Sequence, residues 1–189
     1  MPRLFTALQL PPDLADALAE FAVPLAGARW IEPQDMHLTL RFVGDIDNLA
    51  ADEFHAALSR IDEPAFTLTL SGFGAFGGQQ PRTLWAGVGD NPWLDALARA
   101  NDRAARSAGL PPDKHAFKPH VTLARLKGTR PEAVARVLGQ LGAFASAPFQ
   151  VESFALFSSR PKVGGGPYVI EDTFSLRGAD YAGSWAGDL

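Results

Sequence analysis

A four-residue pattern that could do chemistry occurs twice in this chain, as HLTL at residues 37–40 and as HVTL at residues 120–123. A strand turns alternate side chains to opposite faces, so the histidine and threonine of each copy would share one face while the two aliphatic residues face a core. An imidazole can donate or accept a proton near neutral pH. Two such strands lying side by side would give one cleft two imidazoles and two hydroxyls, which suits metal-free acid and base catalysis on a phosphate ester.

The flanks of the two copies are also alike. A proline precedes each copy (Pro33 and Pro119), and an arginine follows each at nearly the same offset (Arg41 and Arg125). A lone His-x-Thr on a strand is an ordinary feature of a half-buried sheet face. Its duplication with similar flanks favours a catalytic pair instead.

The chemistry of phosphodiester cleavage explains why two histidines would be needed. In-line displacement removes a proton from the nucleophile on one side of phosphorus and delivers another to the leaving oxygen on the opposite side. Imidazoles, with a pKa of about 6.5, can serve in either role. The two motifs are nearly symmetric, so their residues alone do not say whether His37 or His120 is the acid.

Composition limits the class of protein. The chain has 189 residues, which is long enough to bury a sizeable core, with 47% apolar and 20% charged residues, as in ordinary soluble proteins. No apolar run reaches the roughly 18 residues of a membrane span, and the N-terminal stretch lacks the features of a signal peptide. We therefore expect a cytoplasmic protein with no membrane partner. The chain has no cysteine, so it can form neither disulfides nor thiolate metal sites.

The formal net charge of -4 disfavours a protein that coats long stretches of nucleic acid. A phosphate at a strand end or in a small nucleotide needs only a local group of cations. Residues available for such a group are Arg41, Arg82, Lys118, Arg125 and Arg160.

The order of the predicted elements indicates an α+β fold built twice. Periodicity predicts strands at 3–9, 36–43, 66–70, 83–88, the second motif, 149–158 and 168–176, and helices at 12–23, 48–61, 92–108 and 131–141. Each half contains strands, helices and one His-x-Thr copy, which implies two lobes facing each other across a groove. No linker separates the halves, so residues 1–189 should form a single bilobal domain.

The segment Gly72–Gly77 matches the dinucleotide-binding pattern GxGxxG, but we reject that assignment. The dinucleotide motif requires a helix directly after the glycines, whereas residues 78–81 lead into another predicted strand. We expect a glycine-rich hairpin loop between the strands at 66–70 and 83–88. Phe73 and Phe76 in this loop could stack on a base or simply anchor the loop to the core.

The other two histidines, and the charged residues of one helix, are expected to have no catalytic role. His55 lies off the apolar stripe of its predicted helix, and His115 falls in a polar loop with no partner suggested by its spacing. In the helix at 92–108, charged residues four apart form pairs on the predicted outer face, including Asp102 with Arg106. We expect these charges to be solvated.

Four segments resemble the signature segments of the two-histidine (2H) phosphoesterases, in particular the RNA 2′,3′-cyclic phosphodiesterases formerly called 2′-5′ RNA ligases. They are WIEPQDMHLTLRFVG at 30–44, PRTLWAGV at 81–88, FKPHVTLAR at 117–125 and LFSSR at 156–160. The similarity runs from about residue 3 to residue 176. It implies two pseudo-symmetric α+β lobes, each an antiparallel sheet with helices outside, whose concave faces form one central groove.

The resemblance also implies a reaction and roles. The family opens a terminal 2′,3′-cyclic phosphate on RNA to leave a 2′-phosphate, without a metal or other cofactor. His37 would then be the proton donor and His120 the proton acceptor, while Thr39, Thr122 and Arg125 would bind the phosphate. Further candidate substrate contacts are Arg41, Phe73, Phe76, Arg82, Lys118 and Arg160. The partners implied are RNA 3′ ends or small cyclic nucleotides, and we expect a monomer.

Three alternatives remain open at this stage. The histidines could ligate a metal, although the chain has no HExxH and no His-x-His. The protein could bind RNA ends without turnover. The same histidines would also serve 2′-5′ joining of tRNA halves, or cleavage of another 2′-linked ester such as a 2′-5′ oligonucleotide or cyclic ADP-ribose phosphate.

Overall fold

The computed structural model describes residues 3–159 and 168–178 of the chain. The prediction that each His-x-Thr copy lies on a strand is confirmed, because one strand begins at His37 and another at His120. The elements in chain order are β1 (Arg3–Gln9), α1 (Pro12–Ala19), β2 (Ala28–Trp30), the short 3₁₀ helix η1 (Pro33–Asp35), β3 (His37–Asp45), α2 (Asn48–Leu58), β4 (Phe66–Leu68), β5 (Leu70–Phe76), β6 (Thr83–Val88), α3 (Pro92–Ser107), β7 (His120–Leu126), α4 (Pro131–Leu141), β8 (Phe149–Val151), β9 (Ser153–Ser159) and β10 (Tyr168–Ser175).

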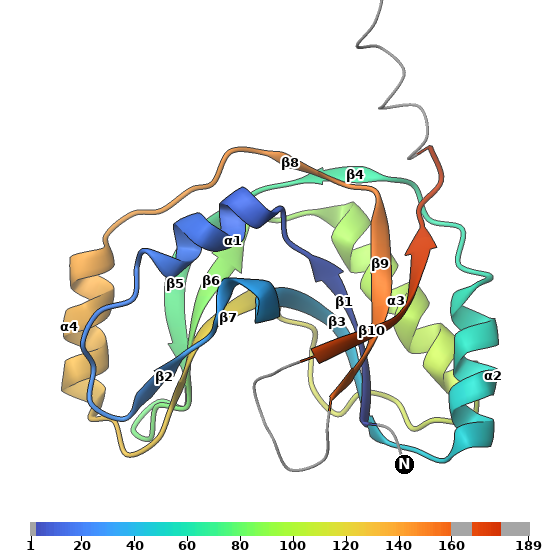
Figure 1. Cartoon of the computed structure of the whole chain (residues 1–189), viewed down its shortest axis with the longest axis horizontal. Coiled ribbons are helices and arrows are strands. Elements are labelled where there is room, and N and C mark those ends of the chain that lie inside the picture. Colours follow the sequence, from blue (N-terminus) through green and yellow to red (C-terminus); the bar gives the residue numbers. More distant parts are fainter. Residues whose placement is uncertain (1–2, 160–167, 179–189) are drawn as a thin grey trace, which may run out of the picture.

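The main sheet consists of two halves. Strands β10, β9, β1 and β3 follow one another in the first half, and β7, β6 and β5 in the second, with β2 also paired to β7. Every pairing within the sheet is antiparallel. Figure 1 shows the two halves side by side, with α4 at the far end of one and α2 at the far end of the other. The expected α+β architecture with two lobes is confirmed.

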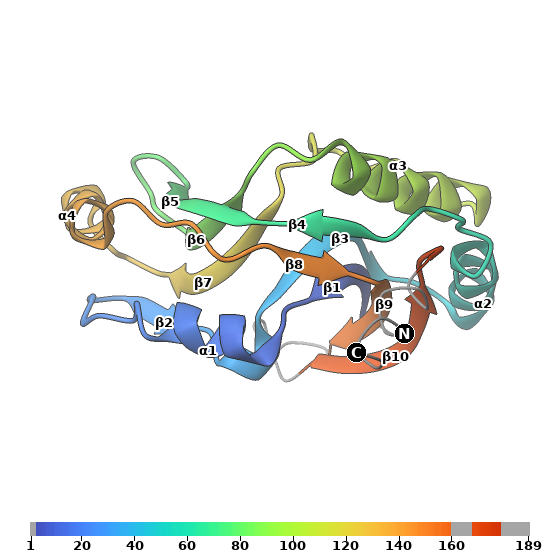
Figure 2. The same cartoon turned by 90° about the horizontal axis from the view of Figure 1, so that it is seen from above.

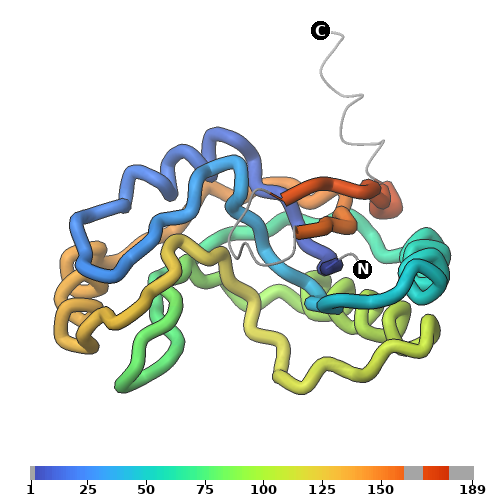
Figure 3. The backbone as a smooth tube through the Cα atoms, turned by 60° about the horizontal axis from the view of Figure 1, so that its bottom comes forward, coloured from blue at the N-terminus to red at the C-terminus, as the bar shows by residue number. Residues whose placement is uncertain are grey.

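The two lobes meet at β3 and β7, and the joint is narrow. A single residue pair, Leu38 with Val121, bridges these antiparallel strands. Figure 3 shows the two strands lying side by side in the middle of the molecule. Each partner is the residue between the histidine and the threonine of its own motif, so the two motifs are neighbours in space although 83 positions separate them in the chain.

The aliphatic residues of the motifs face the core, as expected. Leu38 and Val121 are 0% exposed, Leu40 is 4% exposed and Leu123 is 1% exposed. They belong to a core cluster that also contains buried side chains of α1, α2 and α3, while α4 packs with β6 and β7 in a second cluster. Figure 2 shows the strands between α3 on one side and α1 on the other. This burial of one strand face leaves the histidines and threonines on the opposite face.

The predicted hairpin of 66–70 with 83–88 is wrong for residues 66–68 and holds only at Leu70, which pairs with Val88. Phe66–Leu68 pairs with Phe149–Val151 in a separate two-stranded sheet, and the glycine-rich segment is itself the strand β5, which pairs with β6. A glycine is required at position 74 of this strand, because a Cβ atom there would lie 2.3 Å from the ring of Trp85 on β6. The rejection of the dinucleotide-binding motif at Gly72–Gly77 is confirmed, since β5 leads through a turn into β6 and not into a helix.

Other boundaries also differ from expectation. The first helix ends at Ala19, well before Pro24, and Phe21 packs edge-on against the rings of Phe73 and Phe144. The predicted strand 149–158 is broken at Glu152 into β8 and β9, which belong to different sheets. The short elements β2 and η1 had no periodic signal and were not predicted. Within the described residues, no helix is long and apolar enough to cross a membrane.

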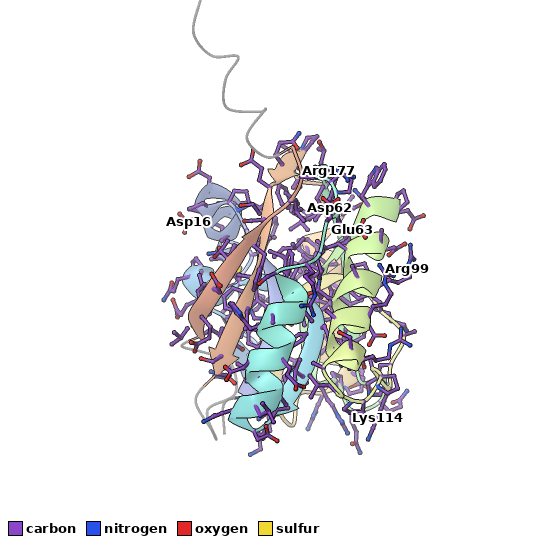
Figure 4. All side chains as sticks on the ribbon, turned by 90° about the vertical axis from the view of Figure 1, so that its right-hand side faces the viewer. Asp16, Asp62, Glu63, Arg99, Lys114 and Arg177 are labelled. Atoms are coloured by element: carbon purple, nitrogen blue, oxygen red, sulfur yellow. The ribbon has the colours of Figure 1, made fainter. Side chains whose placement is uncertain are left out.

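His55 and Asp102 are not simply solvated, contrary to expectation. His55 Nε2 lies 2.5 Å from the Asp172 carboxylate of β10, which ties α2 to the sheet. This contact holds the pKa of Asp172 below its ordinary value. Asp102 pairs with Arg106 at 3.0 Å and also, at 3.0 Å, with Arg41. At the surface beside α2, Arg177 pairs with Asp62 at 2.9 Å (Figure 4).

Candidate active site

The joint between β3 and β7 brings the two motifs into one site. In an antiparallel ladder the residues flanking a pair oppose one another, so the Leu38–Val121 bridge sets His37 opposite Thr122 and Thr39 opposite His120. The pockets at the joint agree, because one is lined by both His37 and Thr122 and another by both Thr39 and His120. The four residues of the two His-x-Thr pairs therefore form one crossed arrangement on a single sheet face.

Both imidazoles are oriented in the same way by the backbone. His37 Nδ1 lies 2.8 Å from the carbonyl oxygen of Asp35, and His120 Nδ1 lies 2.6 Å from that of Lys118. In each case the carbonyl belongs to the residue two positions earlier and can only accept, so Nδ1 carries the proton and donates it. The Nε2 atom of each ring is thereby left to exchange protons with a ligand.

His37 lies within a group of aromatic rings. The ring centroids of Phe5 and Tyr168 are each 4.9 Å from that of His37, with Tyr168 edge-on, and Phe157 stacks at 5.9 Å. Burial among these rings lowers the pKa of His37 below its ordinary value of 6.5, and the Arg125 and His120 charges act in the same direction. The Asp35 carbonyl contact and carboxylate charge oppose this decrease.

His120 has a similar but more open environment. Phe76 contacts it edge-on at 4.9 Å between ring centroids, and Trp85 lies at 6.3 Å. Burial again lowers its pKa, the Lys118 carbonyl contact raises it, and the Arg125 charge lowers it. Burial thus lowers the pKa of both imidazoles, which favours their neutral form.

Arg125 lies where its charge acts on both histidines. It is exposed on β7, and within the described residues no carboxylate pairs with it. It lines a small pocket at the centre of the site, and the residues lining that pocket are Ile31, Asp35, His37, Thr122, Arg125 and Tyr168. An exposed guanidinium beside two imidazoles and a hydroxyl is suited to binding a phosphate group.

Two larger pockets flank the small one. The first, of about 390 Å³, lies between η1, α1 and β10 and reaches His37. The second, of about 380 Å³, lies between β3, α3 and the loop before β7 and reaches Thr39 and His120. Figure 4 shows Asp16, from the first pocket, and Arg99, from the second, on opposite sides of the molecule. Each pocket is large enough for part of a small ligand.

Arg41 lines the second large pocket together with Thr39 and His120, but its guanidinium is engaged by other groups of the fold. Its side chain is 7% exposed, its Nε lies 3.0 Å from Asp102, and its Nη1 lies 3.5 Å from Asp113 and 2.6 Å from the Phe42 carbonyl oxygen. Its other terminal nitrogen donates to the Pro111 carbonyl. These contacts fasten the loop before β7 to α3, so the guanidinium is already occupied within the fold.

The remaining candidates are placed differently from one another. Phe76 lies against His120, whereas Phe73 packs with Phe21 and Phe144 and anchors β5. Lys118 is exposed at the rim of the second large pocket, and Arg82 is exposed at the start of the β6 region. Arg160 lies outside the described residues.

Several residues at the site were not predicted. Tyr168, Phe5 and Phe157 enclose His37, and Gln9 is its partner across β1 and β3. Phe42 is 47% exposed and lines the second large pocket. The strand alternation of Phe5 and Gln9 was visible in the sequence, but which strand would lie next to β3 was not.

The metal alternative can be compared with the residues present. Among the described residues, no group of three or more His, Cys, Asp or Glu side chains is arranged to hold a metal ion. The partners of the histidines at the joint are threonines, which are poor zinc ligands.

Comparison with known proteins identifies the family. The sequence pattern of the 2′-5′ RNA ligase superfamily matches residues 10–162. The chain belongs to this superfamily of two-histidine phosphoesterases. A superfamily protein from Aeropyrum pernix, named RNA 2′,3′-cyclic phosphodiesterase, is 36% identical over 151 residues, covering 77% of this chain and 83% of the relative. A protein of the same name from Thermus thermophilus is 31% identical over 191 residues, covering 93% and 91%.

Solved structures of the superfamily share the fold. A Thermus thermophilus protein of 29% identity superposes with a TM-score of 0.77, over 93% of this chain and 98% of the other. Escherichia coli LigT in complex with 3′-AMP, of 26% identity, gives a TM-score of 0.73 over 94% and 99%. The expected membership in the 2H phosphoesterases and the expected fold are therefore both confirmed.

Proposed function

We propose that this protein hydrolyses terminal 2′,3′-cyclic phosphates of RNA, or of small cyclic nucleotides, to 2′-phosphomonoesters. The observation that carries the proposal is the crossed pair of motifs, in which two Nδ1-anchored imidazoles share one sheet face beside Arg125. Relatives that cover most of this chain bear the name RNA 2′,3′-cyclic phosphodiesterase, which supports this substrate class.

In the proposed mechanism His37 is the general acid and His120 the general base. Nε2 of His120 takes a proton from the attacking water, and Nε2 of His37 gives a proton to the departing 3′ oxygen. The P–O3′ bond breaks as the bond from the water oxygen to phosphorus forms, so the phosphate remains on the 2′ oxygen. The donation from each Nδ1 to a fixed carbonyl holds both rings in the tautomer that this transfer requires.

Thr39, Thr122 and Arg125 are proposed to bind the phosphate oxygens. The threonine hydroxyls lie on the same face as the histidines and can donate hydrogen bonds to non-bridging oxygens. The Arg125 guanidinium would offset the charge of the phosphate. A bound phosphate would in turn raise the pKa of both imidazoles, which increases the fraction of each that is protonated. No cofactor is required by this scheme.

Both histidines come from one chain, which supports a single bilobal unit over residues 1–189 that acts as a monomer. Hydrolysis of other 2′-linked esters would use the same groups in the same roles, and joining of 2′-5′ RNA ends, as the reverse of a cleavage, would use them with acid and base exchanged.

The test is hydrolysis of adenosine 2′,3′-cyclic phosphate with excess chelator, with the product isomer identified by chromatography against 2′-AMP and 3′-AMP. We expect 2′-AMP from the wild type, and at least about a 100-fold loss of kcat in His37→Ala and in His120→Ala. His55→Ala is the matched control, because His55 lies on α2 beside β10 and should leave the rate unchanged. Near-normal turnover by either motif variant, or binding of 2′-AMP without turnover by the wild type, would contradict the proposal.

A further inference from the structure

Asp35 stands at a point where the two halves of the site differ. It is the last residue of η1 and lies two positions before His37, where the second motif has Lys118 before His120. The backbone contact is duplicated, since both residues offer a carbonyl oxygen to the following Nδ1. The side chains are not duplicated, because one is an acid and the other a base.

Asp35 is held rigidly. Pro33 begins η1, the Asp35 N–H donates to the Glu32 carbonyl at 2.9 Å, and the Met36 N–H donates to the Pro33 carbonyl at 3.1 Å. Met36 is buried at 6% exposure and anchors the turn in the core. The Asp35 backbone is therefore held at the edge of the small central pocket, which Asp35 lines together with His37.

The carboxylate also links η1 to β10. The backbone N–H of Tyr168 donates to Asp35 Oδ1 at 3.4 Å, and the Tyr168 ring contacts His37 edge-on. Asp35 thus contacts Nδ1 of His37 through its backbone carbonyl, and it contacts the backbone of Tyr168, whose ring lies against His37, through its carboxylate.

The charged and titratable groups around His37 come from several elements. Arg125 and His120 face it from β7, Tyr168 from β10, and Asp35 from η1, while Asp16 of α1 lines the far part of the first large pocket. Burial and the charges of Arg125 and His120 lower the pKa of His37. The carbonyl contact and the charge of Asp35 raise it. A general acid must carry its proton when substrate arrives.

We propose that Asp35 is a positioning residue that holds the His37 ring in orientation and favours its protonated form over that of His120, and so assigns the acid role to the first motif. This inference rests on the proposed function. Lys118 supplies the same carbonyl without the negative charge, which suits a histidine that must accept a proton. The difference between these two positions breaks the near symmetry of the motifs.

The test uses Asp35→Asn, which keeps an oxygen acceptor for the Tyr168 N–H but removes the charge. Asp16→Asn is the matched control, because Asp16 and Asp35 both line the first large pocket and Asp16 is at an exposed position on α1. The pH dependence of kcat/KM is measured for all three proteins with adenosine 2′,3′-cyclic phosphate. The basic limb of this profile reports the acid of the free enzyme, and the acidic limb reports the base.

A nearby negative charge favours the imidazolium form, so its removal in Asp35→Asn should lower the pKa of His37. We therefore expect the basic limb of the profile to move to lower pH by about half a pH unit or more, while the acidic limb stays where it is. Asp35→Glu should restore part of the shift. A merely structural role would lower the rate equally at every pH, and that result, or an unmoved basic limb, would overturn the inference. In addition, NMR titration of the His37 ring should give a lower pKa in Asp35→Asn. That readout needs no turnover, so an inactive wild type would refute the proposed function while an unchanged His37 titration would refute this inference.

Discussion

Arg41 and Arg125 provide a sharp test, because they follow the two motifs at nearly the same offset and yet have opposite surroundings. Arg41 is buried and contacts Asp102, Asp113 and two backbone carbonyls. Arg125 is exposed beside both histidines. We predict that Arg41→Met chiefly costs stability, whereas Arg125→Ala chiefly costs activity.

The magnitude for Arg41 follows from its burial. Removing one partner of a buried ion pair typically costs about 3–5 kcal/mol, since the remaining charge loses its partner. The Asp102 and Asp113 side chains are 26% and 39% exposed and can be partly hydrated, so we expect a lower value. A loss of about 2–3 kcal/mol in a chain of this length should lower Tm by roughly 4–12 °C.

The magnitude for Arg125 follows from its exposure and place. A surface substitution changes the free energy of unfolding by about 0.5 kcal/mol or less. Loss of a preorganised donor to a reacting phosphate costs about 100-fold in kcat or more. Thermal melts followed by circular dichroism, with kcat/KM per folded molecule, separate the two effects. Arg41→Met with an unchanged Tm and lost activity would refute this reading, as would Arg125→Ala with full activity.

Two further predictions concern the histidines and their aromatic neighbours. Burial holds the pKa of His37 and His120 below 6.5 in the folded protein, so the unfolded chain protonates these two imidazoles more readily. The stability that the neutral imidazoles contribute is therefore present above about pH 6.5 and is lost as the pH falls toward their pKa values in the folded protein. Tm measured by calorimetry should fall between about pH 7.5 and pH 5, less steeply in His37→Phe; an equal slope would contradict this. Phe76→Leu removes the edge-on contact to His120 and should lower kcat/KM roughly 2- to 10-fold with little change in Tm, whereas Phe73→Leu should lower Tm and leave kcat/KM near normal.

The placement of the motifs could be predicted because strand alternation is local. Leu38 and Val121 face the core and the histidines face the groove, as the alternation requires. The pairing of β3 with β7 could not be read from spacing, because it joins residues that are far apart in the chain. The glycine-rich strand was missed for a related reason, since glycine is a poor strand residue and only the ring of Trp85 across the sheet explains Gly74.

The arginines show a subtler failure of alternation. Strict alternation puts Arg41 on the face of His37 and Thr39, but the β1–β3 register skips Leu40, and this bulge turns Arg41 inward and brings Phe42 opposite Phe5. A register shift in β7 skips Leu123 in the same way. It brings Arg125, five positions after His120, toward the site. A bulge of one residue carries no clear sequence signal, so Arg41 and Arg125 looked equivalent in the sequence. The residue of the first motif that corresponds in position to Arg125 is Phe42, five positions after His37.

The central claim is that two imidazoles act on one phosphate, and binding of the product 2′-AMP tests it most directly. The protein is labelled with ¹⁵N-histidine and titrated with 2′-AMP, and the ring signals are assigned with His37→Gln and His120→Gln. We predict that the His37 and His120 signals move together toward the protonated form, with one midpoint and a stoichiometry of one, while those of His55 and His115 stay in place. Movement of only one of the two motif histidines, or two different midpoints, would contradict the account.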